Sequence, residues 1–425
     1  MKYIYFNQES NWAEKLARPL QNMAELSTVV RKVMDRVRDE GDRGLLALTQ
    51  EFDRVSLTDI QVSQEEMSRA VDLIDDELKA ALKQAKANIE LFHRSQEVEV
   101  EKIETQAGVQ CWRESRPIDT VGLYIPGGTA PLLSTVLMLA VPAVVAGCPQ
   151  IVLCSPPNRS GQIHPAILYA ASLCGVHAVY KVGGSQAIAA MTYGTDTVVK
   201  VNKIFGPGNQ YVTCAKVLAQ QEGVAIDMPA GPSEVLVWCD DEARPDFVAA
   251  DLLAQAEHGV DSQVVLVCDS PDYGARVEAE LERQLEFLPR RDIIKVVLEN
   301  SSIVVANEKE AIEVINFYAP EHLIIQRNTK SYQLADIANA GSVFIGPYTP
   351  ESAGDYASGT NHTLPTNGFA TAYSGVSLDS FVKKITFQEI SKTGLTHLEK
   401  IISPMAAAEE LEAHRRAVLI RLDKQ

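Results

Sequence analysis

The sequence lacks the marks of a secreted protein. None of its seven cysteines forms a CxxC pair, and several lie in apolar runs, where cysteine behaves as a small buried hydrophobe. The first residues, MKYIYFNQESNW, contain no apolar core of the kind found in a signal peptide. Together these absences predict a protein of the reducing cytoplasm.

Basic patches are absent as well. Lys and Arg number 39 against 56 Asp and Glu, which gives a formal net charge of -17, and no stretch concentrates the basic residues. Such a surface repels a phosphate backbone, so neither nucleic acid nor an anionic membrane is expected as a partner. A chain of 425 residues, 46% of them hydrophobic, is long enough for two or more domains, each with its own core.

No charged residue occurs between Asp119 and Arg159, and residues 132–148 are almost wholly apolar. This run is shorter than the roughly 20 residues of a membrane span, and prolines punctuate it, so a transmembrane helix is disfavoured. The flanking segments VGLYI and QIVLCS are typical of strands buried on both faces of a parallel sheet. The region therefore predicts a strand, a turn, a helix and a second strand of a soluble α/β domain.

The dinucleotide fingerprint GxGxxG is also missing. Three other glycine-rich turns nevertheless follow expected strands: Pro126-Gly127-Gly128, Gly183-Gly184-Ser185-Gln186 and Gly206-Pro207-Gly208-Asn209. Any single one of them is more simply explained as structural punctuation. The three together, with the polar side chains of Tyr124, Gln186 and Asn209 at their edges, favour a cofactor cleft, because such turns expose N–H groups that hold phosphates.

The segment DLLAQAEHG, residues 251–259, is expected to end a helix that begins near Pro245. Gln255 and His258 lie three residues apart, so a helix would bring both side chains to one face, where they could converge on a metal ion or a ligand. From these nine residues alone, an ordinary helix terminus is the favoured explanation, with His258 offsetting the helix dipole.

Two later segments carry candidate catalytic groups. Glu321 and His322 stand side by side at one end of an expected strand, where α/β enzymes place catalytic groups, and they could serve as base and acid; a solvated loop pair is an equal alternative. Residues 348–369, rich in Gly, Ser, Thr and Pro, are expected to form a structured active-site loop. Asp355 is the natural metal ligand of this loop, and His362 is the other candidate.

The end of the chain, residues 405–422, is expected to be one alanine-rich helix that carries several glutamates and His414. A solvated face is the ordinary explanation of these charges. A short C-terminal helix with little core of its own can also reach across to a neighbouring subunit.

Taken together, the motifs resemble a known family. The segments YIPGGTAPLLSTVLMLAVPAVVAGC, VGGSQAIAA, IFGPGN, DMPAGPSE, DLLAQAEHG, APEHL, ESAGDYASGTNH and EELEAH, in this order and spacing, look like those of the histidinol dehydrogenases over nearly the whole chain. The resemblance implies zinc-dependent oxidation of L-histidinol to L-histidine through the aldehyde, in the last steps of histidine biosynthesis. It also implies that two NAD molecules and one water are consumed.

A fold and an assembly are implied by the same resemblance. The family's fold is similar to that of aldehyde dehydrogenases: α/β, with two Rossmann-like doubly wound domains, an N-terminal helical arm, and a C-terminal helical tail exchanged between the subunits of a homodimer. The implied boundaries are residues 1–20 for the arm, 21–120 plus 233–376 for the domain with the catalytic and zinc residues, 121–232 for the NAD-binding domain and 377–425 for the dimerisation tail.

Residue roles are carried over position by position. The resemblance makes His322 the base for the alcohol step and Glu321 the base that activates water. One zinc ion per subunit would be held by Gln255, His258, Asp355 and, from the other subunit, His414. Substrate contacts would come from Ser233, Gln255, His258, His322, Asp355, Glu409 and His414, and NAD contacts from Tyr124, Gln186 and Asn209.

Rival classes remain open. A zinc hydrolase could use a similar His and Asp site, but it would not need three glycine-rich turns and would work without NAD. An aldehyde dehydrogenase with a thiol nucleophile would need a reactive cysteine, and Cys148 and Cys154 lie nearest to the expected cleft. A catalytically inactive binding protein is disfavoured, because the whole catalytic set is present.

Overall fold

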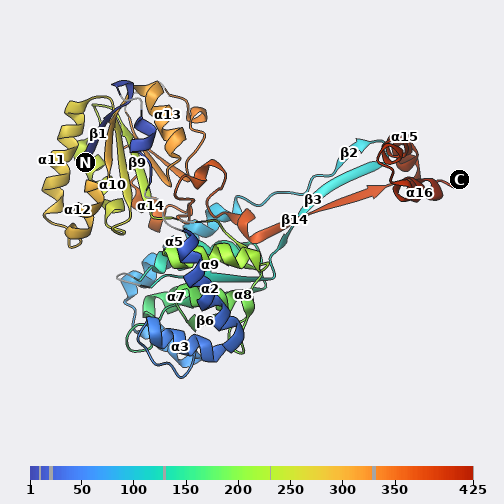
Figure 1. Cartoon of the computed structure of the whole chain (residues 1–425), viewed down its shortest axis with the longest axis horizontal. Coiled ribbons are helices and arrows are strands. Elements are labelled where there is room, and N and C mark those ends of the chain that lie inside the picture. Colours follow the sequence, from blue (N-terminus) through green and yellow to red (C-terminus); the bar gives the residue numbers. More distant parts are fainter. Residues whose placement is uncertain (9–10, 19–22, 128–130, 230, 328–331, 425) are drawn as a thin grey trace. The chain divides into compact units, whose positions relative to one another are not determined.

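The computed structural model describes residues 1–8, 11–18, 23–127, 131–229, 231–327 and 332–424. The chain forms two compact units, both drawn in Figure 1: residues 1–95 with 119–381, and residues 96–118 with 382–425. The first unit contains two parallel sheets, one of five strands and one of six. Within the described residues, no helix combines the length and apolar character needed to cross a membrane.

The five-stranded sheet contains the two charge-free strands, VGLYI and QIVLCS, that the sequence predicts. It consists of β4 (Thr120–Tyr124), β5 (Gln150–Ser155), β6 (Ala178–Lys181), β7 (Lys203–Phe205) and β8 (Ala225–Ile226), in the order β6-β5-β4-β7-β8 and all parallel. The connecting helices are α6 (Leu133–Val145), α7 (Pro165–Cys174), α8 (Gly184–Tyr193) and α9 (Gln210–Gln221). The chain turns in opposite directions on the two sides of β4, so this sheet is doubly wound around β4.

Helices from the N-terminal part of the chain cover this sheet. They are α2 (Met23–Glu40), α3 (Asp42–Phe52), α4 (Gln64–Asp72) and α5 (Asp76–Arg94). Helix α2 contacts α8 and α9, α4 contacts α7, and α5 contacts α6. Helices α2 and α3 are separated at Gly41, whose φ is +56°, and Gly44 lies within α3. The implied domain boundaries stay predictions, although these contacts favour grouping residues 23–95 with the five-stranded sheet.

The six-stranded sheet repeats the same strand order with one strand added. Its members are β9 (Glu234–Cys239), β10 (Gln263–Cys268), β11 (Ser302–Val305), β12 (His322–Gln326), β13 (Ser342–Ile345) and β1 (Lys2–Tyr5), in the order β1-β11-β10-β9-β12-β13. Side chains alternate along β9: Val235 and Val237 pack with α10 (Pro245–Ala256), α11 (Pro271–Leu285) and α12 (Arg291–Glu299). Leu236 and Trp238 pack on the other face with α13 (Glu308–Tyr318).

The expected N-terminal helical arm is wrong for residues 2–5. They form β1, a parallel edge strand paired with β11, followed by a short 3-10 turn at Phe6–Gln8 and the one-turn helix α1 (Trp12–Lys15). Ile4 is buried in the core of the six-stranded sheet, which is why this short apolar stretch pairs instead of forming a free arm.

The second unit combines an antiparallel sheet with two helices. Strands β2 (Ile103–Gln106), β3 (Val109–Pro117) and β14 (Val382–Ile390) form the sheet, and α15 (Lys392–Ala408) contacts α16 (Glu412–Arg421). The single helix expected over residues 405–422 is therefore wrong. The chain leaves the helical conformation at Glu410, whose φ is +59°, and restarts at Glu412. Exchange of this unit between subunits stays a prediction.

Candidate active site

Glu321 and His322 lie at the amino end of β12, not at the carboxyl end where open α/β sheets bind their ligands. This position corrects the expectation from the sequence. Helix α13 ends at Tyr318, and Ala319 in the left-handed conformation (φ +48°) followed by Pro320 turns the chain directly into the strand. The neighbouring parallel strand β9 begins at Glu234, so the start of β9 lies beside these two residues.

The backbone of Glu234 contacts both candidate catalytic side chains. Its N–H donates to Glu321 Oε2 at 2.9 Å, and its carbonyl oxygen lies 3.3 Å from His322 Nδ1. A carbonyl only accepts, so this contact places the proton of a neutral His322 on Nδ1 and leaves the lone pair on Nε2. His322 Nε2 is buried and has no hydrogen-bond partner. This tautomer suits a base that takes a proton at Nε2.

Burial shapes the electrostatics of the pair. Desolvation lowers the pKa of His322 to about 3 and raises the pKa of Glu321 well above its ordinary value. Both effects favour the uncharged form of a buried group. His322 is thereby kept neutral near pH 7, with the Nε2 lone pair unprotonated, while Glu321 is a stronger base than an exposed carboxylate whenever it is ionised.

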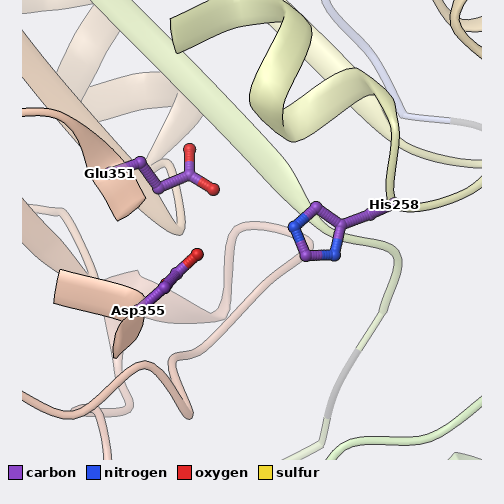
Figure 2. Close-up of side chains that lie close together, drawn as sticks. All are labelled: His258, Glu351 and Asp355. Atoms are coloured by element: carbon purple, nitrogen blue, oxygen red, sulfur yellow. The ribbon is translucent and has the colours of Figure 1, made fainter. Parts of the chain in front are cut away.

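A metal-binding geometry lies next to His322. Helix α14 (Glu351–Tyr356) presents Glu351 and Asp355 four residues apart, and His258 approaches them from the end of the α10 region, as Figure 2 shows. One ligand atom from each of these three residues lies within 4.8 Å of the other two. Asp355 Oδ1 is also 3.8 Å from His322 Nε2.

The expected pairing of Gln255 and His258 on one helical face is wrong. Helix α10 ends at Ala256, so Gln255 is its penultimate residue and His258 lies beyond it, exposed at the turn. The Gln255 side chain is fully buried against Glu351. With its carboxamide turned so that Nε2 donates, Nε2 reaches both oxygens of Glu351, and the amide oxygen accepts from the Glu234 N–H at 3.2 Å.

The donor set fits a divalent cation with N and O ligands. His258 offers a ring nitrogen, and Asp355 and Glu351 offer carboxylate oxygens, which are ordinary zinc ligands. Burial raises the pKa of Asp355 to about 7, and burial together with repulsion from Asp355, Glu321 and Asp251 raises that of Glu351 well above its ordinary value. Such a crowd of buried carboxyl groups is relieved by a bound cation.

His362, the other candidate in this loop, has both ring nitrogens engaged. Nδ1 lies 3.1 Å from the Asp355 carbonyl oxygen, and Nε2 lies 3.1 Å from Thr135 Oγ1. The pKa of His362 is lowered to about 4, chiefly by burial. These contacts make His362 a support for the Asp355 backbone rather than a metal ligand.

The expected cofactor residues gather at the carboxyl ends of the five-stranded sheet. Tyr124 ends β4, and its hydroxyl accepts a hydrogen bond from the Gly184 N–H at 3.0 Å. Gln186 lies in the first turn of α8. Asn209 caps α9, where its side chain accepts from two backbone N–H groups. All three line a cavity of about 760 Å³. Gly127 lines it too, whereas Gly128 of the same predicted turn lies outside the described residues.

A second cavity, of about 330 Å³, reaches Glu321, one of the two candidate catalytic groups. It is lined by Ser233, His258, Glu321 and His362, and it shares Tyr124, Gly127 and Asn209 with the first cavity. Ser233 immediately precedes β9, which explains its place at this edge of the sheet. The two cavities therefore meet at the turn after β4.

The remaining expected site residues belong to the other unit. Glu409 caps the end of α15 and His414 lies in the first turns of α16, and both are exposed. Their participation in the site stays a prediction. Cys154, a candidate nucleophile of a rival class, is fully buried, and burial raises the pKa of its thiol, which disfavours the reactive thiolate.

Three residues of the site, Glu351, Glu234 and Arg18, were not expected from the sequence. The spacing of Glu351 and Asp355 at i and i+4 in ESAGD was a usable signal, because it places two carboxylates on one helical face. Glu234 acts through its backbone, and Arg18, which contacts the Glu234 side chain, comes from a distant segment, so neither carried a local signal.

Comparison with known proteins identifies close relatives. The family model described as histidinol dehydrogenase matches residues 16–422. The histidinol dehydrogenase of Bacteroides thetaiotaomicron is 57% identical over 424 residues, covering 100% of this chain and 99% of that protein, and that of Bacteroides fragilis is 56% identical over 427 residues with the same coverage. The crystal structure of histidinol dehydrogenase from Elizabethkingia anophelis superimposes with a TM-score of 0.97 at 52% identity, covering 100% of this chain and 98% of that one.

Proposed function

This chain belongs to the histidinol dehydrogenase family, and is thereby an oxidoreductase; we propose that it oxidises L-histidinol to L-histidine through L-histidinaldehyde, with two NAD molecules and one water. The observation that carries the proposal is the junction of the two cavities at Tyr124, Gly127 and Asn209. One cavity contains the residues expected to contact NAD, and the other contains Glu321 and Ser233. A nicotinamide bound at this junction would lie between the cofactor cleft and the proposed proton acceptors.

In the first half-reaction, the hydroxyl of histidinol loses its proton while hydride leaves the same carbon for NAD. His322 is the proposed acceptor of that proton, at the unpartnered Nε2. Its Nδ1 proton is held by the Glu234 carbonyl, which fixes the ring orientation. The products of this step are the aldehyde, NADH and protonated His322.

In the second half-reaction, water adds to the aldehyde carbon and a second hydride leaves for a second NAD. Glu321 is the proposed acceptor of the water proton, because its carboxylate lines the smaller cavity and is oriented by the Glu234 N–H. His322 Nδ1 and Glu321 Oε2 are 3.7 Å apart, so the two proposed bases are adjacent side chains. The product is the carboxylate of histidine.

The proposed zinc site contains Gln255, His258 and Asp355, with His414 from a second subunit. Bound zinc would hold the imidazole and amino nitrogens of histidinol and favour the neutral amine, so its contribution is positioning. Glu351 lies in the same cluster. Ser233 and Glu409 complete the proposed substrate contacts. Because the proposal takes His414 from a second subunit, it requires a homodimer with two shared sites.

The proposed setting is the cytoplasm, with no nucleic acid or membrane partner. The chain carries a net charge of -17, which disfavours both polyanions, and its partner is a small molecule.

The first experiment measures NADH by absorbance and histidine by chromatography, with purified protein, L-histidinol and NAD, in the presence and absence of a zinc chelator. We expect two NADH per histidine, loss of turnover on chelation and recovery with zinc. Turnover of histidinol without NADH formation would contradict the proposal.

The shared site is tested by mixing two inactive variants, His414→Ala and His322→Ala. After subunit exchange, a hybrid dimer contains one site with both lesions and one with neither, so activity should return to roughly a quarter of the wild-type level for random exchange of equal amounts. Subunit exchange is verified beforehand by native mass spectrometry. No recovery despite verified exchange contradicts a site built from two chains.

A further inference from the structure

Two buried oxygen atoms in the cofactor cavity have no hydrogen-bond partner. They are Asp53 Oδ2, from the residue that caps the end of α3, and Ser155 Oγ, from the last residue of β5. Both residues line the 760 Å³ cavity that also contains Tyr124, Gln186 and Asn209. Buried polar atoms are nearly always paired, so two unpaired oxygens on one cavity indicate a ligand that donates hydrogen bonds there.

The usual acidic residue of a dinucleotide site is absent from its usual place. In Rossmann sheets, a carboxylate about 20 residues after the glycine-rich turn, near the second strand, accepts from the ribose hydroxyls. Here the second strand of the sheet, β5, ends in Ser155, and Pro156 and Pro157 follow. Asp53 brings a carboxylate to the same cavity from the helical layer that covers the sheet.

The charge of the cavity discriminates between cofactors. Among its described lining residues Asp53 is the only carboxylate, and none is Lys or Arg. NADP carries a 2′-phosphate, which needs a cation such as an arginine near the ribose. A 2′-phosphate beside Asp53 would meet a like charge and lose its hydration without compensation, whereas the hydroxyl of NAD would donate to the free oxygen.

The apolar walls locate the adenosine end of the cofactor. Phe52, next to Asp53, and Val29 are 50% and 52% exposed and both line this cavity. An exposed aromatic ring beside the carboxylate provides a stacking surface for a base. Glu321, one of the two proposed bases, lines the other cavity, and both cavities share Tyr124. A dinucleotide bound here would have its nicotinamide near Tyr124 and its adenosine near Phe52.

We propose that Asp53 accepts hydrogen bonds from the adenosine ribose of the cofactor and selects NAD over NADP, with Ser155 as a second ribose contact. This inference rests on the proposed function, since it assumes that the cavity holds a nicotinamide dinucleotide. Asp53 is a specificity-determining residue in this role, and the chemical steps at His322 and Glu321 do not involve it.

The test compares Asp53→Asn with wild type, using steady-state kinetics with NAD and with NADP and calorimetric binding of AMP and of adenosine 2′,5′-bisphosphate. Loss of a charge-assisted hydrogen bond should raise KM for NAD roughly ten- to hundredfold with little change in kcat. The preference for NAD over NADP, as a ratio of kcat/KM values, should fall at least about tenfold, and AMP binding should weaken in parallel. Asp59→Asn, an exposed carboxylate nearby in the sequence, is the matched control and should change neither ratio nor binding.

Two outcomes overturn the inference. Equal weakening of NAD and NADP, which leaves the NAD preference unchanged, would place Asp53 away from the 2′ position. Unchanged KM for NAD and unchanged AMP binding would show that Asp53 makes no contact with the ribose. If Asp53→Asn does not fold, Asp53→Ser and Ser155→Ala provide the same measurement. Wild-type protein that oxidises histidinol with NAD separates a failure of this inference from a failure of the proposed function.

Discussion

Arg18 and Glu234 form a buried ion pair in which Arg18 Nε donates to Glu234 Oε2 at 2.5 Å and Arg18 Nη2 donates to Oε1 at 2.9 Å. Their side chains are only 18% and 3% exposed. Arg18 Nη2 also donates to the Tyr318 carbonyl at 2.6 Å, and the guanidinium lies 3.9 Å from the centre of the Tyr318 ring. The N-terminal segment thereby holds the residue whose backbone contacts Glu321 and His322.

Replacing Arg18 by Ala should impair catalysis through this positioning role. We expect kcat to fall at least about tenfold with KM for histidinol little changed, because Glu234 loses its partner and the bases lose their orientation. Removing one partner of a buried pair also costs about 3 kcal/mol of unfolding free energy. Steady-state kinetics and chemical denaturation measure the two effects.

Guanidinium rescue separates positioning from simple destabilisation. Millimolar guanidinium should restore part of the Arg18→Ala activity, whereas Arg18→Lys should remain impaired because an ammonium cannot make the bidentate contact. Arg69→Ala, which removes an exposed i, i+4 pair with Glu65, is the control and should behave as wild type. A change in KM for histidinol without any loss of kcat would argue against the positioning role.

Replacing Glu351 by Gln should weaken zinc binding. The carboxylate lies within 4.8 Å of ligand atoms on His258 and Asp355 and beside the Gln255 amide, so its loss removes charge and orientation at once. Changes of this kind cost roughly ten- to hundredfold in metal affinity. Competition with a chromophoric chelator measures the affinity, and Glu313→Gln on the exposed face of α13 is the control. Equal affinities for both variants would exclude Glu351 from the metal site.

His93 should make the fold sensitive to mild acid. The Nδ1–H of His93 donates to the Ile89 carbonyl at 2.8 Å, and its Nε2 lies 3.4 Å from Asn361 Nδ2. The same Asn361 Nδ2 donates to the Met138 carbonyl at 2.6 Å. A proton on Nε2 would oppose the amide N–H. Burial accordingly lowers the pKa of His93 below its ordinary value of 6.5.

The sign of the pH effect follows from that shift. Below about pH 6.5 the unfolded chain takes up a proton that folded His93 refuses, so the contribution of His93 to stability is present above that pH and is lost as the pH falls. We expect up to about 1.4 kcal/mol of unfolding free energy lost per pH unit from this residue. His93→Gln should flatten the profile measured by urea denaturation between pH 7 and pH 5; an identical slope for wild type and variant would refute this assignment.

Gly206 should tolerate no side chain. Its φ is +129°, and an added Cβ would overlap the carbonyl oxygen of Tyr124, where the two cavities meet. Gly206→Ala should therefore displace the turn that carries Asn209 and abolish NAD binding, with a clear drop in melting temperature. Gly223 also has a positive φ, +83°, but no atom lies within 4 Å of an added Cβ. Gly223→Ala should therefore cost only about 1 kcal/mol of unfolding free energy. Equal effects of the two substitutions would contradict the steric argument.

Local patterns in the sequence determined the buried strands β4 and β5 and the family resemblance, but not the edge strand β1. The uncharged run from residue 120 to 158 forms β4, α6 and β5 because a parallel sheet buried on both faces excludes charge, a requirement that can be read from composition alone. The turns that follow β4, β6 and β7 were identified by their glycines for the same local reason. Tyr124, Gln186 and Asn209 were found in this way, and they line one cavity.

Only the tertiary structure decided which distant residues meet. Gln255 and His258 looked like a helical pair, but the helix ends between them, and their partners Glu351 and Asp355 come from a segment almost 100 residues later. Glu321 and His322 lie beside Glu234 because strand order, which periodicity does not encode, pairs β12 with β9. Arg18 and Asp53 reach their sites through packing between segments far apart in the chain. Such contacts depend on the whole fold, whereas hydrophobic patterns and turn glycines are local, and this difference separates what the sequence alone determined from what it left to the structure.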